Sequence, residues 1–323
     1  MGRIYHSITE LIGHTPLLEL HALEKEIGTD ARILGKLEFF NPSGTVKDRI
    51  AFSMIAGKEA AGELKPGGTI IEGTSGNTGI GIAAIGAAKG YKVKICMPDN
   101  LSEERTRILK AFGAEVYHTP GAQNMGGANA KAAELLAGTE NAVILGQGGN
   151  PNNPLAHYRT TGPEIWEDTE GKVDIFVSAA GTGGTVSGTG KFLKEHNPAV
   201  KVVGVEPAGS ALLNGGAPGP HKIQGIGGGA IPPVTDVSIF DEVIDVTDED
   251  AYAYARLIPK LEGFTVGISA GAALRAAAEV AKRPENAGKN IVVAGTITCP
   301  ATCTNNQRYM KNPVPRHGVF HHL

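Results

Sequence analysis

Short apolar runs alternate with longer stretches of helical periodicity along most of this chain. The apolar runs predict buried strands at residues 69–73, 92–98, 114–119, 142–146, 174–180, 201–207 and 290–295. Between them, small-residue or amphipathic stretches predict helices over 77–90, 102–113, 127–138 and 185–196. Strands separated by helices of this length need crossover connections, so neighbouring strands pair in parallel. The pattern therefore predicts an α/β fold with parallel-rich, twisted sheets flanked by helices.

Two turn-rich segments interrupt this alternation. The stretch GQGGNPNNPLAH at 146–157 divides the strand–helix series into two parts, as expected of a boundary between structural units. With 323 residues, the chain is long enough for roughly two domains. The second segment, 215–233, is too long for a simple connection, and loops of this kind in compact domains usually carry function.

Composition adds one strong signal and excludes several classes. The chain has 45 glycines, about twice the usual share of ~7%, and they cluster where apolar runs end, which indicates turns and close backbone approach. A net charge of −3 without a basic stripe gives no reason to expect nucleic-acid binding. No apolar span of ~18 residues predicts a membrane helix. Three cysteines argue against a disulfide framework and favour a reduced, cytoplasmic setting.

The three cysteines show no pattern of a metal site. Cys96 lies in an apolar strand pattern, where inert packing is the expected role. Cys299 and Cys303 are spaced C-x-x-x-C and lack the further ligands of a zinc site.

One lysine stands where the chain changes from turn to helix. In NPSGTVKDRI, at 41–50, Ser43 and Thr45 are candidate N-caps, so Lys47 falls in the first helical turn. The helix dipole disfavours a cation there by ~0.3–1 kcal/mol, and an amine in an unfavourable place has a lowered pKa. A lysine that forms a Schiff base needs such an amine, whereas a solvated surface lysine is the alternative.

Two stretches rich in Gly and Thr each follow a predicted strand and lead into a helix. GTSGNTGIG, at 73–81, exposes backbone N–H groups and hydroxyls at a helix N-terminus, which suits a carboxylate or a phosphate. Gly79, Gly81 and Ala84 also match G-x-G-x-x-A of a dinucleotide site, but no acidic residue ends the next strand at the required distance.

The second stretch, AAGTGGTVSG at 179–188, forms a nest of N–H groups with two hydroxyls. It lacks the Gly-Lys-Ser/Thr of a P-loop, so the phosphate of a bound cofactor is a better candidate than a nucleoside triphosphate. Further along, VGISAGAAL places Ser269 at the start of a helix of small residues. Ser269 is either a plain N-cap or a hydroxyl that faces a ligand.

Together these stretches resemble the fold-type II pyridoxal-phosphate enzymes, and among them the cysteine synthase (O-acetylserine sulfhydrylase) and cystathionine β-synthase family. About nine-tenths of the chain is covered, through ITELIGHTPLLEL, KLEFFNPSGTVKDRI, TSGNTGI, HYRTTGPEIW, GTGGTVSG, GPHKIQGIG and VGISAGAA. The resemblance implies the architecture of the tryptophan synthase β-subunit. It also implies a smaller, mobile domain over 41–152, which carries the substrate-carboxylate loop, and a larger phosphate-binding domain formed by 1–40 and 153–323.

The resemblance also implies a role for each matching residue. Lys47 binds pyridoxal 5'-phosphate covalently, Asn77 hydrogen-bonds the cofactor's 3-hydroxyl, and Ser269 faces its pyridine nitrogen. A serine there leaves that nitrogen unprotonated, which restrains competing carbanion chemistry. The implied phosphate-binding residues are Gly181, Thr182, Gly183, Gly184 and Thr185. The implied substrate-binding residues are Thr74, Ser75, Gly76, Thr78, Gln147 and Gly225.

The implied reaction is a ping-pong β-replacement, in which O-acetyl-L-serine loses acetate and sulfide takes its place to give L-cysteine. Lys47 then serves as Schiff-base former and general base in turn. The expected partners are small-molecule substrates (O-acetylserine or serine, with sulfide or a thiol) and a second copy of the chain. A serine acetyltransferase is a candidate partner, and neither a nucleic acid nor a membrane is expected.

Two departures from the family pattern leave alternatives open. Gly148 stands where an aromatic residue usually follows Gln147, which should widen the space beside the substrate, and Gly73 replaces a frequent proline. A wider site would suit a cystathionine β-synthase-like enzyme that joins serine to homocysteine, or a cysteine-degrading, sulfide-releasing lyase. A serine or threonine dehydratase fits less well, because it carries different flanking motifs. A catalytically inactive binding or regulatory homologue would have lost the site residues, which are all present.

Overall fold

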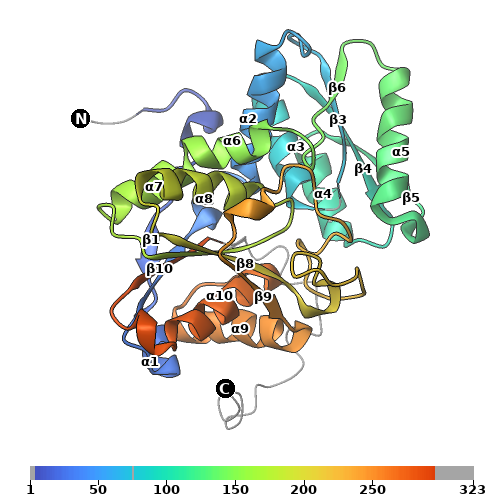
Figure 1. The fold of residues 1–323 in the computed structure, drawn as a ribbon. Helices are drawn as coiled ribbons and strands as arrows, with labels where there is room; N and C mark the ends of the chain where they lie inside the picture. The colour runs from blue at the N-terminus through green and yellow to red at the C-terminus, as the bar shows by residue number, and fades with distance from the viewer. Residues whose placement is uncertain (1–3, 75, 295–323) are drawn as a thin grey trace.

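The computed structural model of the chain describes residues 4–74 and 76–294. The described strands form two sheets, which lie in the lower and the upper part of Figure 1. The six-stranded sheet, in the order β1-β2-β10-β7-β8-β9, consists of β1 (Leu17–Glu19), β2 (Arg32–Lys36), β7 (Ile175–Ala179), β8 (Lys201–Pro207), β9 (Glu242–Val246) and β10 (Asn290–Ala294). β1 runs antiparallel to β2, and the other neighbours pair in parallel.

The four-stranded sheet is entirely parallel. Its order is β5-β4-β3-β6, with β3 (Thr69–Gly73), β4 (Lys92–Pro98), β5 (Glu115–Thr119) and β6 (Ala142–Ile144). These two sheets confirm the predicted α/β class with parallel-rich sheets.

Helices cover both faces of the six-stranded sheet (Figure 1). One face packs on α1 (His21–Ile27), α9 (Asp248–Leu261) and α10 (Ile268–Ala281), and the other on α7 (Thr161–Asp168) and α8 (Gly184–His196). Alternate strand residues belong to the two cores: Ile175 and Val177 point to the first, Phe176 to the second. Because both faces are buried, the strands read as continuous apolar runs rather than as an alternating pattern.

The four-stranded sheet is covered in the same way. Helices α2 (Lys47–Ala60), α3 (Asn77–Lys89) and α4 (Glu103–Ala111) pack on the face that carries Ile70 and Ile95. Helix α5 (Asn124–Ala137) packs on the opposite face, against Ile71 and Cys96. Helix α6 (Asn152–Arg159) contacts both α2 and α8 and so joins the two helix–sheet units.

Several local predictions need correction. The N-cap position of α2 is Val46, not Ser43 or Thr45. The Thr45 hydroxyl still accepts the Lys47 N–H at 3.3 Å, whereas Ser43 donates to the Asp48 carboxylate. Half of the proposed boundary at 146–157 is helical, since α6 begins at Asn152.

Other predictions hold or fall outside the described residues. Cys96 is buried within β4, and burial raises the pKa of its thiol to about 11, as expected of inert packing. Segment 215–233 contains no helix or strand, as predicted. Cys299 and Cys303 lie outside the described residues. None of the helices in 4–74 and 76–294 has the length and apolar character of a membrane span.

Short 3₁₀ helices lie at Ile8–Leu11, Glu38–Phe40, Gly121–Gln123, Ala208–Ser210, Val237–Ile239 and Pro284–Asn286.

Candidate functional site

The candidate residues gather where strands of both sheets end. β3 leads through residues 74–76 into α3, and β7 leads through 180–183 into α8. In open parallel sheets, ligands bind outside the carboxyl ends of the strands, where helix N-termini converge. Both Gly- and Thr-rich stretches therefore occupy the position expected of a ligand site.

Lys47 is the first residue of α2, with a half-buried side chain. Its amine makes no hydrogen bond or ion pair with any residue in 4–74 or 76–294. Burial lowers the pKa of this amine to about 8, and the Glu38 carboxylate opposes the shift only in part. A substantial fraction of the amine is therefore neutral near pH 7–8, as covalent addition to an aldehyde requires.

A buried ion network fixes the first turn of α2. The Arg49 guanidinium, 2% exposed, donates two hydrogen bonds of 2.8 Å to Glu38 and bonds of 2.6 and 2.7 Å to Glu164 on α7. The Lys36 ammonium on β2 lies 2.9 Å from the same Glu164 carboxylate. Burial alone would raise the pKa of Glu38, but the charge and hydrogen bonds of Arg49 override it and lower this pKa to about 2. Carboxylates from two segments distant in sequence thus orient Arg49, two residues after Lys47.

The loop from Gly181 to Thr185 presents unpaired donors. Within the described residues, none of its five backbone N–H groups donates a hydrogen bond. Gly183 has φ +77°, and its backbone passes close to a neighbouring loop, since a Cβ there would lie 2.2 Å from the Thr235 hydroxyl. A Cβ at Gly184 would lie 1.9 Å from Asn153 Oδ1. Free N–H groups at the start of α8 form a cradle that fits a phosphate.

Two side chains of α6 support the hydroxyls of this loop. Asn153 Nδ2 donates to Thr182 Oγ1 at 3.0 Å, and His157 Nε2 lies 3.2 Å from Thr185 Oγ1. Burial, followed by the charges of Arg49 and Lys47, lowers the pKa of His157 to about 3, so the imidazole is neutral. Asn153 and His157 were missed as site residues. Their four-residue spacing on one helix places them on one face, but nothing in the sequence names the loop that this face meets.

Thr78, at the start of α3, contacts residue 147. The Thr78 hydroxyl donates to Gln147 Oε1 at 2.7 Å. The Thr74 N–H donates to the Cys96 carbonyl at 3.0 Å, and the Gly76 N–H to the Thr74 hydroxyl at 3.4 Å. Asn77 begins α3 and is half-buried. Ser75, the remaining predicted substrate-binding residue, lies outside the described residues.

The loop 215–233 brings Gly225 against two other predicted residues. A Cβ at Gly181 would lie 2.5 Å from the Gly225 carbonyl oxygen, and a Cβ at Gly225 would lie 3.7 Å from Ser269 Oγ. The N-cap of α10 is Gly267, and the Ser269 hydroxyl makes no hydrogen bond with the described residues. Ser269 is therefore not a plain N-cap.

The same loop touches the four-stranded unit. Arg105 on α4 donates to the side chain of Gln224 at 3.0 Å.

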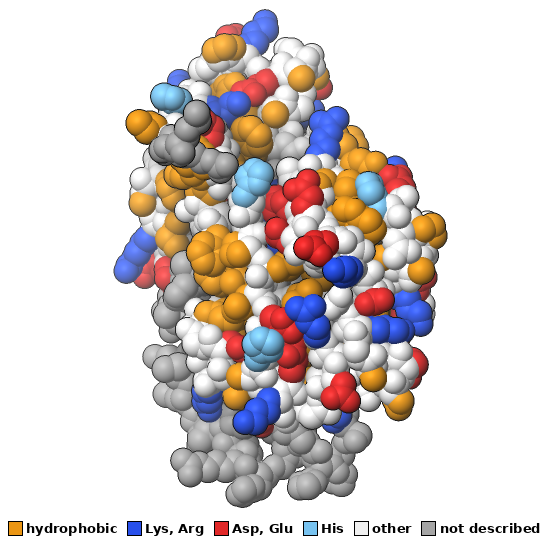
Figure 2. Space-filling model, turned by 90° about the vertical axis from the view of Figure 1, so that its left-hand side faces the viewer, with side chains coloured by type: hydrophobic (Ala, Val, Ile, Leu, Met, Phe, Trp, Pro, Cys, Tyr) orange, Lys and Arg blue, Asp and Glu red, His pale blue; other side chains and the backbone are white. Residues whose placement is uncertain are grey.

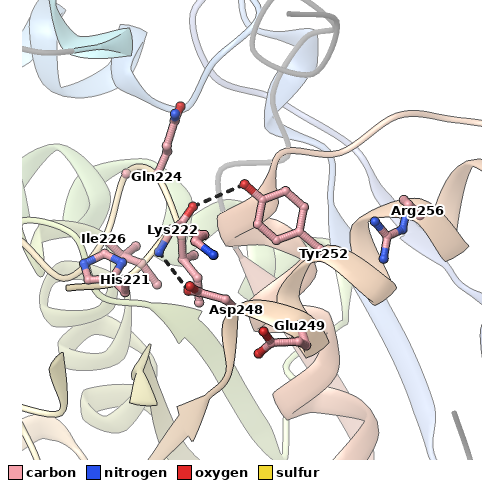
Figure 3. Close-up of a pocket in the computed structure, with 10 residues that line it drawn as sticks. His221, Lys222, Gln224, Ile226, Asp248, Glu249, Tyr252 and Arg256 are labelled. Atoms are coloured by element: carbon pink, nitrogen blue, oxygen red, sulfur yellow. Dashed lines mark hydrogen bonds between the residues drawn. The ribbon is translucent and has the colours of Figure 1, made fainter. Parts of the chain in front are cut away.

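A surface pocket of about 630 Å³ lies between this loop and α9 (Figure 3). The Lys222 N–H donates to Asp248 at 2.8 Å, and the Tyr252 hydroxyl to the Lys222 carbonyl at 3.5 Å. Of the predicted site residues, only Gly225 lines it. These contacts anchor residues 221–226, and with them Gly225, to α9.

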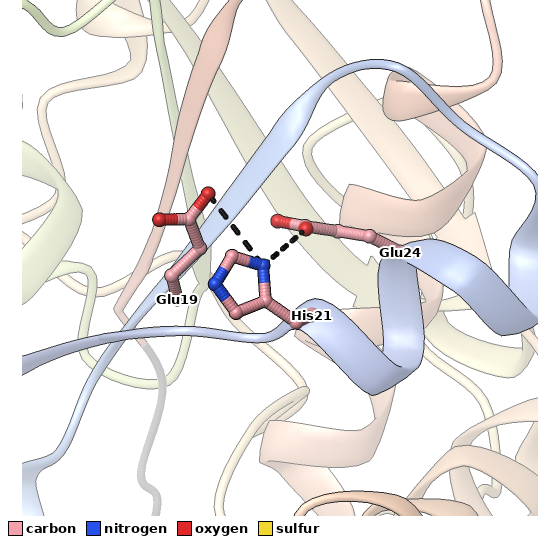
Figure 4. A group of neighbouring side chains, drawn as sticks. All are labelled: Glu19, His21 and Glu24. Atoms are coloured by element: carbon pink, nitrogen blue, oxygen red, sulfur yellow. Dashed lines mark hydrogen bonds and ion pairs between the residues drawn. The ribbon is translucent and has the colours of Figure 1, made fainter.

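One cluster of metal-ligating types lies elsewhere on the surface. His21 Nδ1 is 3.2 Å from Glu24 and 3.8 Å from Glu19 (Figure 4). Both carboxylates already have protein partners, since Glu19 accepts two hydrogen bonds from Arg32 and Glu24 accepts the Ile33 N–H. The geometry therefore points to a surface ion-pair cluster.

Comparisons with known proteins agree with this arrangement. Residues 8–296 match the family model described as "Pyridoxal-phosphate dependent enzyme". The chain is 50% identical to the probable cysteine synthase of Bacillus subtilis (strain 168), over 88% of this chain and 91% of that protein. A cysteine synthase from Entamoeba histolytica superposes with a TM-score of 0.92 at 45% identity, over 97% of this chain and 93% of that one. A hydrogen sulfide-producing enzyme from Fusobacterium nucleatum superposes with a TM-score of 0.88 at 44% identity, over 93% and 99% of the two chains. The chain therefore belongs to the family of pyridoxal-phosphate dependent enzymes.

Proposed function

We propose that this protein is a pyridoxal-phosphate-dependent cysteine synthase, which converts O-acetyl-L-serine and sulfide into L-cysteine and acetate. The observation that carries the proposal is the arrangement around Lys47. A half-buried amine with a pKa of about 8 begins α2, and the loop that leads into α8 presents five N–H groups that donate to none of the described residues. An amine that can bond to an aldehyde and a phosphate cradle are the two groups that pyridoxal phosphate requires. The names of the relatives favour cysteine synthesis over the alternative activities.

The chain's residues divide the chemistry between them. When bound, the cofactor supplies an electron sink that acidifies the α-proton of the substrate. Lys47 holds the cofactor and then removes and returns this proton, which allows acetate to leave the β-carbon and sulfide to add there. Gly181–Thr185 bind the phosphate, with the two threonine hydroxyls oriented from α6.

The remaining assignments concern orientation. Asn77 hydrogen-bonds the cofactor's 3-hydroxyl, and the open hydroxyl of Ser269 faces its pyridine nitrogen. The substrate carboxylate is bound by the stretch Thr74–Thr78 together with Gln147, and Gly225 closes the other side of the substrate. We assign the smaller, mobile domain to 41–152 and the larger one to 1–40 plus 153–323. Carboxylate binding would move the smaller domain against the loop at 215–233 and exclude water.

The test compares substrates on one preparation. Purified protein should be yellow and should form cysteine from O-acetylserine and sulfide faster than cystathionine from serine and homocysteine, or sulfide from cysteine alone. Lys47→Ala should abolish both colour and turnover. Lys58→Ala, at the far end of the same helix, where the half-buried lysine pairs with Glu63, is the matched control and should change neither. A preparation that prefers serine with homocysteine, or that stays colourless with added cofactor, would reject the proposal.

We also propose that the protein works as a cytoplasmic homodimer. Support for the dimer comes from the N-terminal segment, where Ile4, Tyr5, Ile8 and Leu11 are 84%, 46%, 46% and 40% exposed. Figure 2 shows the face on the N-terminal side of Figure 1, where hydrophobic side chains lie among charged ones. Exposed apolar side chains of this kind are typical of a protein–protein interface. A serine acetyltransferase is a second candidate partner, and co-elution with it is the direct test.

A further inference from the structure

Glu72 is a buried carboxylate to which the chemistry above assigns no role. It is the fourth residue of β3, two positions before Thr74, and only 2% of it is exposed. It makes no ion pair with any residue of the described chain. A carboxylate in such a place is costly unless hydrogen bonds satisfy its oxygens.

Three consecutive backbone N–H groups satisfy this carboxylate. Leu145 and Gly146 donate to one oxygen at 3.1 and 2.9 Å, and Gln147 donates to the other at 3.2 Å. β3 and β6 pair through Ile71 and Ile144, and their ladder ends there. Beyond this point, the Glu72 carboxylate, rather than the backbone carbonyls of β3, accepts the N–H groups of residues 145–147. Gly146, with φ +66°, allows the three donors to wrap around one carboxylate.

This wrap determines where the Gln147 side chain lies. Gln147 Oε1 accepts the Thr78 hydroxyl at 2.7 Å, so its amide NH₂ remains available to a substrate carboxylate. The backbone carbonyl of Gln147 accepts a hydrogen bond from Asn153 Nδ2 at 2.8 Å. Asn153 Nδ2 also donates to the Thr182 hydroxyl in the phosphate loop. Glu72 thus holds the residue through which the two halves of the site are hydrogen-bonded.

We propose that Glu72 is a positioning residue for the substrate carboxylate and that it acts through Gln147. The inference rests on the proposed function, because it assumes that Thr78 and Gln147 bind that carboxylate. Glu72 itself is buried beneath them and touches no substrate. Its negative charge is spread over three N–H donors, so it fixes these groups with little repulsion of the anion above.

The test measures binding of L-cysteine through the change in cofactor absorbance. Glu72→Gln keeps the size of the side chain but turns an NH₂ group toward backbone donors. We expect the Kd of L-cysteine to rise about tenfold, as for the loss of one charge-assisted hydrogen bond. The absorbance and the cofactor content of the ligand-free protein should stay as in the wild type, because the phosphate loop is intact.

A double-mutant cycle separates this role from a general loss of stability. In a Gln147→Ala background, Glu72→Gln should raise the Kd less than twofold, because the side chain through which it acts on the substrate is gone. The matched control is Glu206→Gln, which alters another buried carboxylate that accepts two backbone N–H groups, at 2.8 and 2.9 Å, in the other sheet. It should lower the Tm similarly and leave the Kd within twofold.

The outcomes are distinguishable from failure of the proposed function. Wild-type protein whose spectrum does not respond to L-cysteine or O-acetylserine would reject the proposed function. A responsive wild type with an unchanged Kd in Glu72→Gln, or with equal effects in both backgrounds, would overturn the positioning role. Glu72→Asp, which keeps the charge on a shorter side chain, is the second variant and should also raise the Kd. Failure of both variants to fold would assign Glu72 a purely structural role.

Discussion

Replacing Arg49 by methionine would leave the buried Glu38 carboxylate without its principal cation. Glu38 is fully buried and accepts two hydrogen bonds of 2.8 Å from Arg49, whereas Glu164 would keep the Lys36 ammonium at 2.9 Å. Breaking a buried pair from one side costs ~3–5 kcal/mol, because the remaining charge stays desolvated. We expect Arg49→Met to lower the free energy of unfolding by about that amount at pH 7, a large share of the ~5–15 kcal/mol of a typical protein.

Urea unfolding at several pH values tests the cause as well as the size of this loss. In the wild type, Arg49 holds the pKa of Glu38 at about 2, so the stabilisation is present above pH 4.5 and is lost only as pH falls toward 2. Without Arg49, burial raises this pKa above its ordinary value. The variant then gains a proton on folding as pH falls from 7 toward 4.5. The difference in the free energy of unfolding between the wild type and Arg49→Met should therefore narrow as pH falls from 7 to 4.5.

Arg32→Met is the matched control for the buried pair. Arg32 also binds a glutamate in two places, with both bonds to Glu19 at 2.7 Å, but its side chain is 52% exposed. Solvent screening limits such a pair to less than about 1 kcal/mol. The argument from burial would be refuted if the two variants lost the same free energy of unfolding. It would also be refuted if the loss in Arg49→Met did not change with pH.

Three further predictions concern the site. The rate at which apoprotein binds pyridoxal phosphate, measured by stopped-flow absorbance, should rise with pH and level off above about 8, since burial lowers the Lys47 pKa to that value. A rate that rises around the ordinary lysine pKa of ~10.4 would contradict this prediction. Gly148→Phe should fold and should favour small substrates over homocysteine, because a Cβ there has a single neighbour within 4 Å among the described residues, Pro232 at 3.8 Å. A ratio of kcat/KM for the two substrate types equal to that of the wild type would remove the pocket argument. Gly183→Ala should weaken cofactor binding at least tenfold, because its Cβ would meet a threonine hydroxyl at 2.2 Å at a φ of +77°. Gly90→Ala is the control, because Gly90 has a similar φ of +76° but open space around its Cβ; it should lower the stability without weakening cofactor binding. Equal losses of cofactor affinity in the two variants would identify backbone strain, not the close contact, as the cause.

The pattern of apolar positions predicted every strand of the four-stranded sheet and three strands of the six-stranded sheet. The strands predicted at 69–73, 92–98 and 201–207 match β3, β4 and β8 residue for residue. β3, β4 and β8 are paired on both sides and buried on both faces, so their sequences are continuously apolar. Three strands of the six-stranded sheet were missed: the edge strands β1 and β9, and β2, which lies between β1 and β10. β1 has three residues and none is fully buried, so its apolar signal is weak.

The sequence also predicted some residues of the candidate site and missed others. Motif resemblance named Lys47, the 74–78 stretch and the 181–185 loop, all of which begin helices after turn residues. It did not name Asn153, His157 or Glu72, which support these stretches from other elements. The turn residues at 41–45, rather than the resemblance, had placed the α2 cap at Ser43 or Thr45. In the structure the Ser43 hydroxyl donates to Asp48, the Thr45 hydroxyl accepts the Lys47 N–H, and Val46 occupies the N-cap position.

The sequence by itself determined the features that depend on neighbours along the chain. Turn residues before Lys47, glycines where φ is positive and apolar runs of strand length are local properties, because they follow from allowed backbone angles and side-chain periodicity. Only the tertiary structure decided which groups are desolvated and which donors meet which acceptors. The sequence predicted a lowered Lys47 pKa from the helix dipole, whereas the structure shows burial as its cause. That burial, the neutral His157 and the wrap around Glu72 all arise between segments distant in sequence. Burial and hydrogen-bond pairing are properties of the packed chain, and no single stretch encodes them.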